Sequence, residues 1–559
     1  MKKIRFSLII FFVFQQIFSQ SINLNQSYLE DEIRDLQILN KLKSKSSLSI
    51  RPINIDYEID SLMNFNLFKK DNKISILPID LISEFNSHLP YNRNNGIMIP
   101  NRGIQTVFSP GIYLNFNFLE VQFKPEILLS ENLYFDGFWD GHYPVIISKR
   151  QNYWNHIDNP ERFGNDFYNE FSIGQSFIKL NFKDISIGLS NENLWWGPSI
   201  RNSIMLSNNA IGFNHLTLNS KKPISTPIGN FEFQLVTGKL IGSEFTQSYN
   251  EFEYAGSLTY VEKNKDWRYF QGINIVYSPK FIDGFSIGFI RWVQAYSKFI
   301  ETNKDYFPVF DNLLRNKDKY GYNTGTLEGL RDQAAGINFR WIWKDSKAEI
   351  YAEYYRNDSA ANLRDLLLDS DHSRAATIGL QKIFDVKKDS YYKFSWEWTQ
   401  MEQSNSKLLR NWGSDISIVV ISWYHHDAIT HGFTNRGEVL GASIGPGSNS
   451  HYFSLSHNNN NRTLGLSFEI VDQNNDFLYY AFHNAKDFRR YWKDFNLELS
   501  FRKKIRNYWI DIKSIYTKSL NYQWALDESN AGQGYDYYIP GIDRNNFHLK
   551  FRLLIPLNF

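Results

Sequence analysis

The stretch FHLKFRLLIPLNF occupies positions 547–559. Large apolar residues fill every second position of it: Phe547, Leu549, Phe551, Leu553, Ile555, Leu557 and Phe559. The polar residues His548, Lys550 and Arg552 stand between them. Because successive side chains of a strand point to opposite faces, this period of two predicts a β-strand with one apolar face. That face must meet a second sheet, as in a soluble sandwich, or lipid, as in a membrane barrel.

The same alternation continues upstream from about residue 101. It is clearest at 119–129, 178–182, 185–189, 348–356, 391–400, 464–470, 495–501 and 508–512. Only Lys183 and Asp184 separate the second and third of these segments, which predicts a hairpin with a very short turn. With about 25 residues for each strand and its connection, positions 101–559 predict about 18 antiparallel strands.

The connections favour a transmembrane β-barrel over a sandwich. Short turns alternate with long stretches rich in Asn, Gly, Asp and Tyr, at 131–170, 242–268, 303–333 and 521–546. Outer-membrane barrels have short turns at one rim and long loops at the other. The aromatic content of 17% suits aromatic girdles at two membrane interfaces, and the mean hydropathy of −0.43 suits a chain without a transmembrane helix. A soluble sandwich stays open as the alternative.

Charge and motif content exclude several classes of function. The formal net charge of +2 argues against a nucleic-acid partner. The absence of cysteine excludes disulfides, thiolate metal sites and a cysteine nucleophile. The cluster HHDAITH at 425–431 holds three His and one Asp, which suggests a metal site, but its spacing matches no HExxH-type pattern. No GxSxG elbow, phosphate loop or dinucleotide fingerprint occurs, so we expect neither an enzyme nor a cofactor or metal.

The N-terminal region predicts a separate unit before the barrel. Residues 1–20 combine three early cations with an apolar stretch, which is typical of a secretory signal peptide cleaved near Gln20. Positions 27–43 predict a helix, because Ser27 and Glu30 have capping-box spacing and a broad apolar stripe follows. Positions 57–69 and 78–87 could form further short helices. Residues 21–100 are therefore expected to be a helical unit and 101–559 the barrel.

The final strand has a special task in a barrel. A closed barrel has no edge, so its last strand must pair with its first. The terminal Phe559 is similar to the C-terminal aromatic by which the barrel-insertion machinery selects its clients.

One segment, 187–240, is more specific than a generic strand pattern. Its distinctive residues are Glu192, Trp195–Pro198, Ser207–Ala210, Gly212, Phe213, His215, Pro223, Pro227 and Gly229. Together with GQSFIKL at 174–180 and HGFTNRGEVLGASIGPGS at 431–448, this block resembles the Wzi family of outer-membrane capsule-assembly proteins.

The resemblance implies an 18-stranded outer-membrane barrel, closed on the periplasmic side by an N-terminal helical plug. Its extracellular loops would attach or assemble surface polysaccharide in the manner of a lectin, as a monomer in outer-membrane lipid and without catalysis. A channel for small or saccharide solutes is the alternative, since the inward face is charged. A membrane hydrolase is a third and weaker hypothesis.

Seven residues are candidate polysaccharide contacts: Trp195, Trp196, Arg201, Asn208, Asn209, His215 and Arg436. The tryptophans could stack on sugar rings, and the polar residues could hydrogen-bond hydroxyl or carboxylate groups. Each also has a structural interpretation. The tryptophans could anchor the membrane interface, the Asn, Arg and His residues could fill the lumen, and Arg436 could set a loop or bulge.

Overall fold

The computed structural model describes thirteen parts of the chain: residues 20–21, 27–42, 44–55, 74–116, 118–313, 330–357, 360, 362–388, 390–403, 422–459, 461–482, 488–527 and 541–556. The predicted signal peptide, apart from Gln20, lies outside these residues, as do positions 57–69 and Phe559. Among the described residues, no helix has the length and apolar character needed to span a bilayer.

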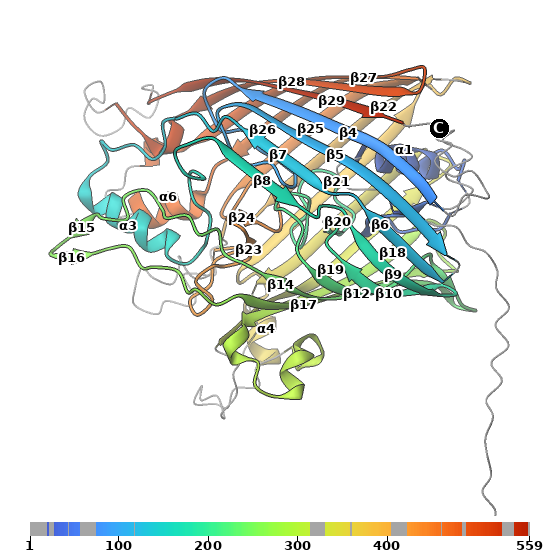
Figure 1. The fold of residues 1–559 in the computed structure, drawn as a ribbon, viewed down its shortest axis with the longest axis horizontal. Helices are drawn as coiled ribbons and strands as arrows, with labels where there is room; N and C mark the ends of the chain where they lie inside the picture. Colours follow the sequence, from blue (N-terminus) through green and yellow to red (C-terminus); the bar gives the residue numbers. More distant parts are fainter. Residues whose placement is uncertain are drawn as a thin grey trace, which may run out of the picture.

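A closed antiparallel barrel forms the body of the molecule (Figure 1). Its segments are β4 (Ile74–Asn86), β5 (Gly103–Phe116), β6 (Leu119–Phe123), β7 (Glu126–Ser130), β8 (Tyr168–Ser172), β9 (Phe177–Phe182), β10 (Ile185–Ser190), β12 (His215–Ser220), β13 (Ile224–Ser225), β14 (Gly229–Leu240), β17 (Arg268–Pro279), β18 (Phe285–Tyr296), β19 (Arg331–Trp343), β20 (Ala348–Asn357), β21 (Arg374–Phe384), β22 (Ser390–Gln400), β25 (Asn449–Asn459), β26 (Arg462–Asp472), β27 (Lys493–Ile505), β28 (Tyr508–Leu520) and β29 (Arg544–Ile555). Three strands are each broken into two segments, namely β6 with β7, β8 with β9, and β12 with β13. The barrel therefore has the 18 strands that the sequence predicted.

Smaller elements lie at the rims and in the lumen. The helices are α1 (Ser27–Ile38), α3 (Pro144–Trp154), α4 (Leu363–Leu368) and α6 (Asn475–Phe482), with 3-10 turns η2 (Ser297–Phe299), η3 (Asn303–Tyr306), η4 (Pro308–Phe310), η7 (Phe488–Arg490) and η8 (Tyr522–Trp524). The two-residue strands pair as β1 (Gln20–Ser21) with β3 (Asn54–Ile55), β2 (Ile50–Arg51) with β11 (Trp195–Trp196), β15 (Glu253–Tyr254) with β16 (Ser257–Leu258), and β23 (Thr434–Asn435) with β24 (Glu438–Val439).

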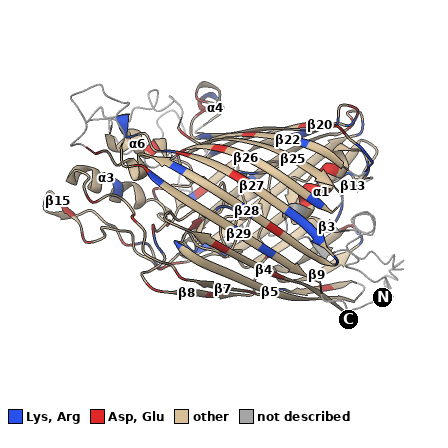
Figure 2. Cartoon of the chain, turned by 90° about the horizontal axis from the view of Figure 1, so that it is seen from above, with Lys and Arg blue, Asp and Glu red and all other residues tan. Residues whose placement is uncertain are grey.

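The two rims of the barrel differ, as the connections predicted. The predicted hairpin of β9 and β10 turns through Lys183 and Asp184 at the short-turn rim, where α1 and the end of β29 also lie. The helices α3 and α6 and the β15–β16 hairpin gather at the opposite, long-loop rim (Figures 1 and 2). The barrel therefore has a short-turn end that holds the N-terminal segment and a long-loop end capped by helices.

Alternation separates the two faces of the wall. In β27, Leu497 and Leu499 are exposed on the outer face, whereas Asn496 and Glu498 point inward and are buried. The same outer face is apolar in the seam strand β29, where Leu549 pairs with the exposed Phe85 of β4. The first and last wall strands thus close the barrel with each other, as expected from the absence of an edge.

The expected boundary at residue 101 is wrong, because the wall begins at Ile74 with β4. The segment 78–87, expected as a helix, belongs to this strand. Pro78 lies where the register with β5 shifts between Leu77 and Asp80, and this bulge interrupts the period of two that would have revealed the strand.

The helix predicted at 27–43 is confirmed as α1, but it ends at Ile38. Asn40 has a φ of 55°, its N–H donates to the Gln37 carbonyl, and the Lys41 N–H donates to the Leu36 carbonyl. This pair of bonds around a left-handed Asn is a Schellman motif, which terminates the helix.

Candidate functional site

The first layer inside the barrel is the N-terminal segment, residues 27–55. Arg34 of α1 donates from Nε to Glu349 Oε1 at 2.5 Å, and Arg340 donates from Nε to the other oxygen of the same carboxylate at 2.8 Å. Asp35 pairs with Lys393 at 2.8 Å. Because Glu349, Arg340 and Lys393 belong to the wall strands β19, β20 and β22, these buried ion pairs hold α1 inside the lumen.

The second layer is made by two long-rim loops that fold into the barrel, residues 191–214 and 422–448. Their apolar side chains and those of the surrounding wall form one buried cluster, which includes Trp196, Met205, Trp292, Tyr424 and Phe433. The Trp292 and Phe433 rings stack with their centroids 4.0 Å apart. The lumen of this barrel therefore contains a buried apolar core.

Wall carboxylates anchor the turn that follows the Trp pair. Glu397 accepts the backbone N–H groups of Ile200 and Asn202, both at 2.7 Å, and Glu353 accepts that of Ser199 at 2.9 Å. Gly197 has a φ of 116°, and a Cβ there would meet Glu353 Oε1 at 2.2 Å. A glycine is therefore needed where the chain passes close to Glu353, which explains Gly197 in the 187–240 block.

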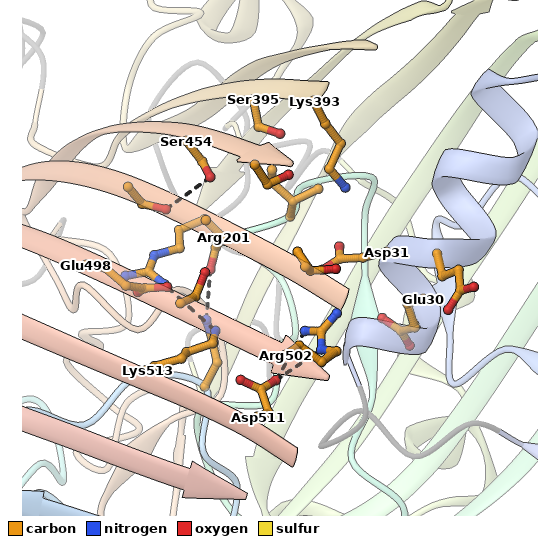
Figure 3. Close-up of a pocket in the computed structure, with 18 of the residues that line it drawn as sticks. Glu30, Asp31, Arg201, Lys393, Ser395, Ser454, Glu498, Arg502, Asp511 and Lys513 are labelled. Atoms are coloured by element: carbon orange, nitrogen blue, oxygen red, sulfur yellow. Dashed lines mark hydrogen bonds and ion pairs between the residues drawn. The ribbon is translucent and has the colours of Figure 1, made fainter. Parts of the chain in front are cut away.

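A polar cavity of about 370 Å³ lies between α1 and the wall strands β25–β29. Figure 3 shows Glu30 and Asp31 on α1 facing a wall that carries Arg502, Lys513 and other charged side chains. Burial is the main cause that raises the pKa of Glu30 to about 7, against the opposing effect of Arg51. Eleven Lys and Arg side chains and seven Asp and Glu side chains line this cavity, so cations are in excess.

The long-loop face carries an aromatic layer, which we call the aromatic cap. Its buried part joins α3, α6 and η8 through Phe138, Tyr153, Phe477 and Trp524. Arg150 lies over the rings of Phe138 and Trp154, at 4.8 and 4.9 Å from their centroids. These stacked contacts order a helical lid over the barrel mouth.

The loop 131–143 brings aromatic side chains to the surface of the cap. Tyr134 and Tyr143 are exposed and Trp139 is half-buried. Arg162 lies 4.6 Å from the Tyr134 ring centroid, and the Trp139 ring meets His142 edge-on at 5.3 Å. Sequence analysis did not select these residues, although the Tyr- and Trp-rich composition of the stretch 131–170 was a usable signal.

The candidate tryptophans lie in the lumen and not at the membrane interface. Trp195 is buried beneath the Arg51 guanidinium, whose carbon is 4.5 Å from the ring centroid. Trp196 is fully buried and donates from Nε1 to Gln234 Oε1 at 2.7 Å. Both side chains pack the plug against the wall, which excludes the anchoring role considered for them.

The polar candidates within the motif block are also held by protein partners. Asn208 and Asn209 donate to the carbonyls of Asn94 and Val439, at 2.9 and 3.0 Å. His215 is buried, and its Nδ1 lies 2.8 Å from the Phe213 carbonyl oxygen. Arg201 faces the charged cavity and pairs with Glu469 at 2.8 Å. This arrangement favours the lumen-filling interpretation.

Arg436 occupies a different place, at the tip of the β23–β24 hairpin. Arg436 and Gly437 have φ values of 49° and 88°, which suit a two-residue hairpin turn. The partly exposed Arg436 guanidinium pairs with Glu170 of the wall. Its turn-forming role agrees with the structural interpretation.

In the HHDAITH segment, His425 and His431 are buried side chains that pack inside the protein. His425 is buried with Nδ1 3.2 Å from the Trp423 carbonyl, His431 Nδ1 lies 2.9 Å from the Tyr296 hydroxyl, and Asp427 is exposed. Burial lowers the pKa of His425 to about 3 and, with Arg268 and Lys263 nearby, that of His431 to about 2. Within the described ranges, no three His, Cys, Asp or Glu side chains gather as a metal site.

The family described as capsule assembly protein Wzi matches residues 122–526. Comparison with curated proteins finds no match. A solved structure described as Wzi, an outer-membrane protein involved in group 1 capsule assembly in Escherichia coli and a carbohydrate-binding β-barrel, has a TM-score of 0.60 at 11% identity, over 97% of this chain and 100% of that chain. OprD from Pseudomonas aeruginosa has a TM-score of 0.38 at 10% identity, over 87% and 94% of the two chains.

The family match covers most of the chain, and the 18-stranded barrel agrees with the fold of the solved Wzi structure. The resemblance read from residues 187–240 is thereby confirmed. The protein belongs to the Wzi family of capsule assembly proteins.

Proposed function

We propose that this protein is an outer-membrane barrel that attaches or assembles polysaccharide at the cell surface by binding it, without catalysis. Family membership is the observation that carries the proposal, since the matching family assembles capsule. The carbohydrate binding described for the Wzi barrel of Escherichia coli supports the same class of ligand here.

The proposed orientation places the long-loop rim outside the cell and the N-terminal segment in the periplasm, as a monomer in the membrane. Outer-membrane barrels have long extracellular loops and short periplasmic turns, which supports this direction. The terminal Phe559 would serve the insertion machinery. The aromatic cap would then meet the polymer at the surface.

The contact surface is proposed to be the loop 131–143. An aromatic ring packs its face against the C–H face of a sugar, so Tyr134, Trp139 and Tyr143 offer stacking sites. Glu131, Asp136 and Arg544 lie around the same loop and could hydrogen-bond sugar hydroxyls. The candidates Trp195, Trp196, Asn208, Asn209 and His215 would then shape the plug behind this surface.

The channel alternative needs an open lumen. Two layers fill the barrel, one from residues 27–55 and one from loops 191–214 and 422–448. This filling favours the attachment role over solute passage.

Deletion of the protein tests its function in cells. We expect deletion to move polysaccharide from the cell-bound fraction to the medium while total synthesis stays unchanged. Unchanged cell-bound and free fractions would contradict the proposal.

Purified barrel in detergent tests the contact surface on a glycan array or with the cells' own polymer. Tyr134→Ala and Tyr143→Ala should each weaken binding about 5- to 10-fold, or about 1–1.4 kcal/mol for one lost ring contact. Tyr508→Ala removes another exposed tyrosine, beside a short turn at the opposite rim; it is the control and should bind as the native protein does. An equal loss of binding in all three variants would contradict a binding site on the aromatic cap.

A further inference from the structure

Polar side chains point outward from the barrel near the long-loop rim, on the face that should meet lipid. In β17 and β18, odd-numbered residues face outward, as the exposed Ile275 and Ile287 show. Gln271 and Arg291 share this parity. In β20 the outward residues are even-numbered, as the exposed Tyr354 shows, and Arg356 shares that parity. A bare arginine on a lipid-facing wall is unfavourable, most strongly at the bilayer midplane.

These outward polar groups are nevertheless at most 8% exposed, because two loops fold back over the outer wall. Arg291 donates to the carbonyls of Val309 and Asp311, at 3.1 and 2.5 Å. The Val309 N–H donates to Gln271 Oε1 at 3.3 Å. The backbone of the β18–β19 loop therefore satisfies the polar groups that lipid could not.

The β20–β21 loop covers its stretch of wall in the same way. Arg356 donates from Nη1 to the Asp369 carbonyl at 3.0 Å, and the Tyr354 hydroxyl donates to the Ser370 carbonyl at 3.0 Å. These contacts tie the end of α4 to the outside of β20. Both views place α4 outside the barrel wall (Figures 1 and 2).

The covering loops turn apolar side chains away from the wall. Six of them are 47–73% exposed: Tyr306, Phe307, Phe310, Leu363, Leu367 and Leu368. Leu363 and Leu367 are four residues apart and share one face of α4. The loops thus replace a polar wall with an apolar outer surface.

This surface lies at the height of a membrane interface. Wall strands of 12 or 13 residues, tilted as outer-membrane strands are, rise roughly 30 Å, slightly more than the apolar band of about 25 Å. The covered positions lie within six residues of the strand ends at the rim. The apolar surface is therefore continuous with the lipid-facing belt that includes Ile275 and Ile337.

We propose that residues 303–313 and α4 form a collar that inserts its apolar side chains into the outer leaflet of the membrane. The collar binds acyl chains on its outer side and the wall arginines on its inner side. It increases the area over which the barrel contacts lipid in the leaflet that faces the surface polymer. Amphipathic segments of this kind lie at the boundary between headgroups and acyl chains.

The absence of cysteine allows a direct test with single spin labels on the full chain. Phe310→Cys and Leu367→Cys, labelled and refolded into phosphatidylcholine vesicles, report accessibility to oxygen and to a water-soluble nickel complex. Ile337→Cys on the belt is the lipid reference, and Leu258→Cys on the β15–β16 hairpin is the water reference. We expect both collar labels to shift toward the lipid reference, with high oxygen and low nickel accessibility.

Two results would overturn the collar. Nickel accessibility equal to that at the Leu258 label would place the loops in water. Protection from both reagents would mean that another protein or a second copy covers the surface. Because the readout is insertion and not polysaccharide binding, its failure would leave the proposed function unaffected.

Discussion

At the scale of single residues, Glu397 shows how one wall carboxylate can order an irregular loop inside the lumen. It accepts the N–H groups of Ile200 and Asn202 and the hydroxyl of Tyr351, at 2.7, 2.7 and 2.8 Å. The neighbouring Glu353 accepts the N–H of Ser199 at 2.9 Å. The turn after the Trp pair therefore depends on Glu397.

We expect Glu397→Gln to destabilise the protein by about 1–3 kcal/mol, because an amide loses the charge and turns a donor toward N–H groups. Thermal unfolding in detergent and proteolysis of the 191–214 loop would measure the loss. Glu262→Gln is the control, since its exposed ion pair with Lys265 should contribute almost nothing. A change no larger than the control's would refute the role of Glu397.

The buried histidines of the 422–448 loop make a prediction about acid. The folded pKa values of His425 and His431, about 3 and 2, lie below the unfolded value of about 6.5. Between these values only the unfolded loop binds the protons, so stability is full above pH 6.5 and falls as the pH drops toward 3. Protonation of each histidine in the unfolded chain lowers the free energy of unfolding by up to about 1.4 kcal/mol per pH unit.

Hydrogen exchange of residues 422–448 from pH 7.5 to 4.5 measures this effect after correction for the intrinsic rate. We expect protection to fall below pH 6.5 and the fall to be shallower in His425→Phe. A flat profile in the native protein would contradict the assignment.

The motif residues could be selected from the sequence, but their roles could not. Trp195, Trp196 and His215 carry the family resemblance, yet a period of two says nothing about whether the loop after a strand folds outward or into the lumen. That choice depends on contacts with residues far along the chain, such as Trp196 with Gln234 and Arg51 with Trp195.

At the scale of elements, the strands with strict alternation were predictable, and the bulged strand β4 was not. The stretches 464–470 and 495–501 lie in β26 and β27 as expected. The segment 78–87, which could have formed a short helix by sequence, belongs to β4, where Pro78 and its bulge break the pattern. Short apolar runs at a bulge look alike in a helix and a strand.

The seam strand β29 makes a prediction about depth in the membrane. Leu549 and Asn545 both face outward, but Leu549 lies within the apolar belt and Asn545 lies at the rim. An arginine costs about 2–4 kcal/mol near the midplane and about 0–1 kcal/mol near the interface. We therefore expect Leu549→Arg to fold into vesicles far less efficiently than Asn545→Arg.

Heat-dependent mobility on gels would give the folded fraction of both variants. Equal fractions would mean that the outer face of the seam does not meet lipid, which would contradict the barrel's placement in a membrane.

At the scale of the whole molecule, the filled lumen predicts electrical behaviour. The two layers leave a charged cavity of about 370 Å³ beside α1, and the apolar core around Trp292 and Phe433 lies in the same lumen. In planar bilayers we expect the full-length protein to show no steady conductance of porin size. Removal of residues 27–55 should raise the current only slightly, because the second layer remains. A stable open channel from the native protein would restore the solute-channel alternative.

The position of α1 also constrains the order in which the chain can assemble. Arg34 and Asp35 precede every wall strand, yet their partners Glu349 and Lys393 lie 315 and 358 residues later. The barrel cannot close before β29 is made, because β29 is the second neighbour of β4. Contacts between such distant positions form slowly. We therefore expect α1 to reach its final contacts only after β20 and β22 have formed, and the barrel to close last, when β29 pairs with β4.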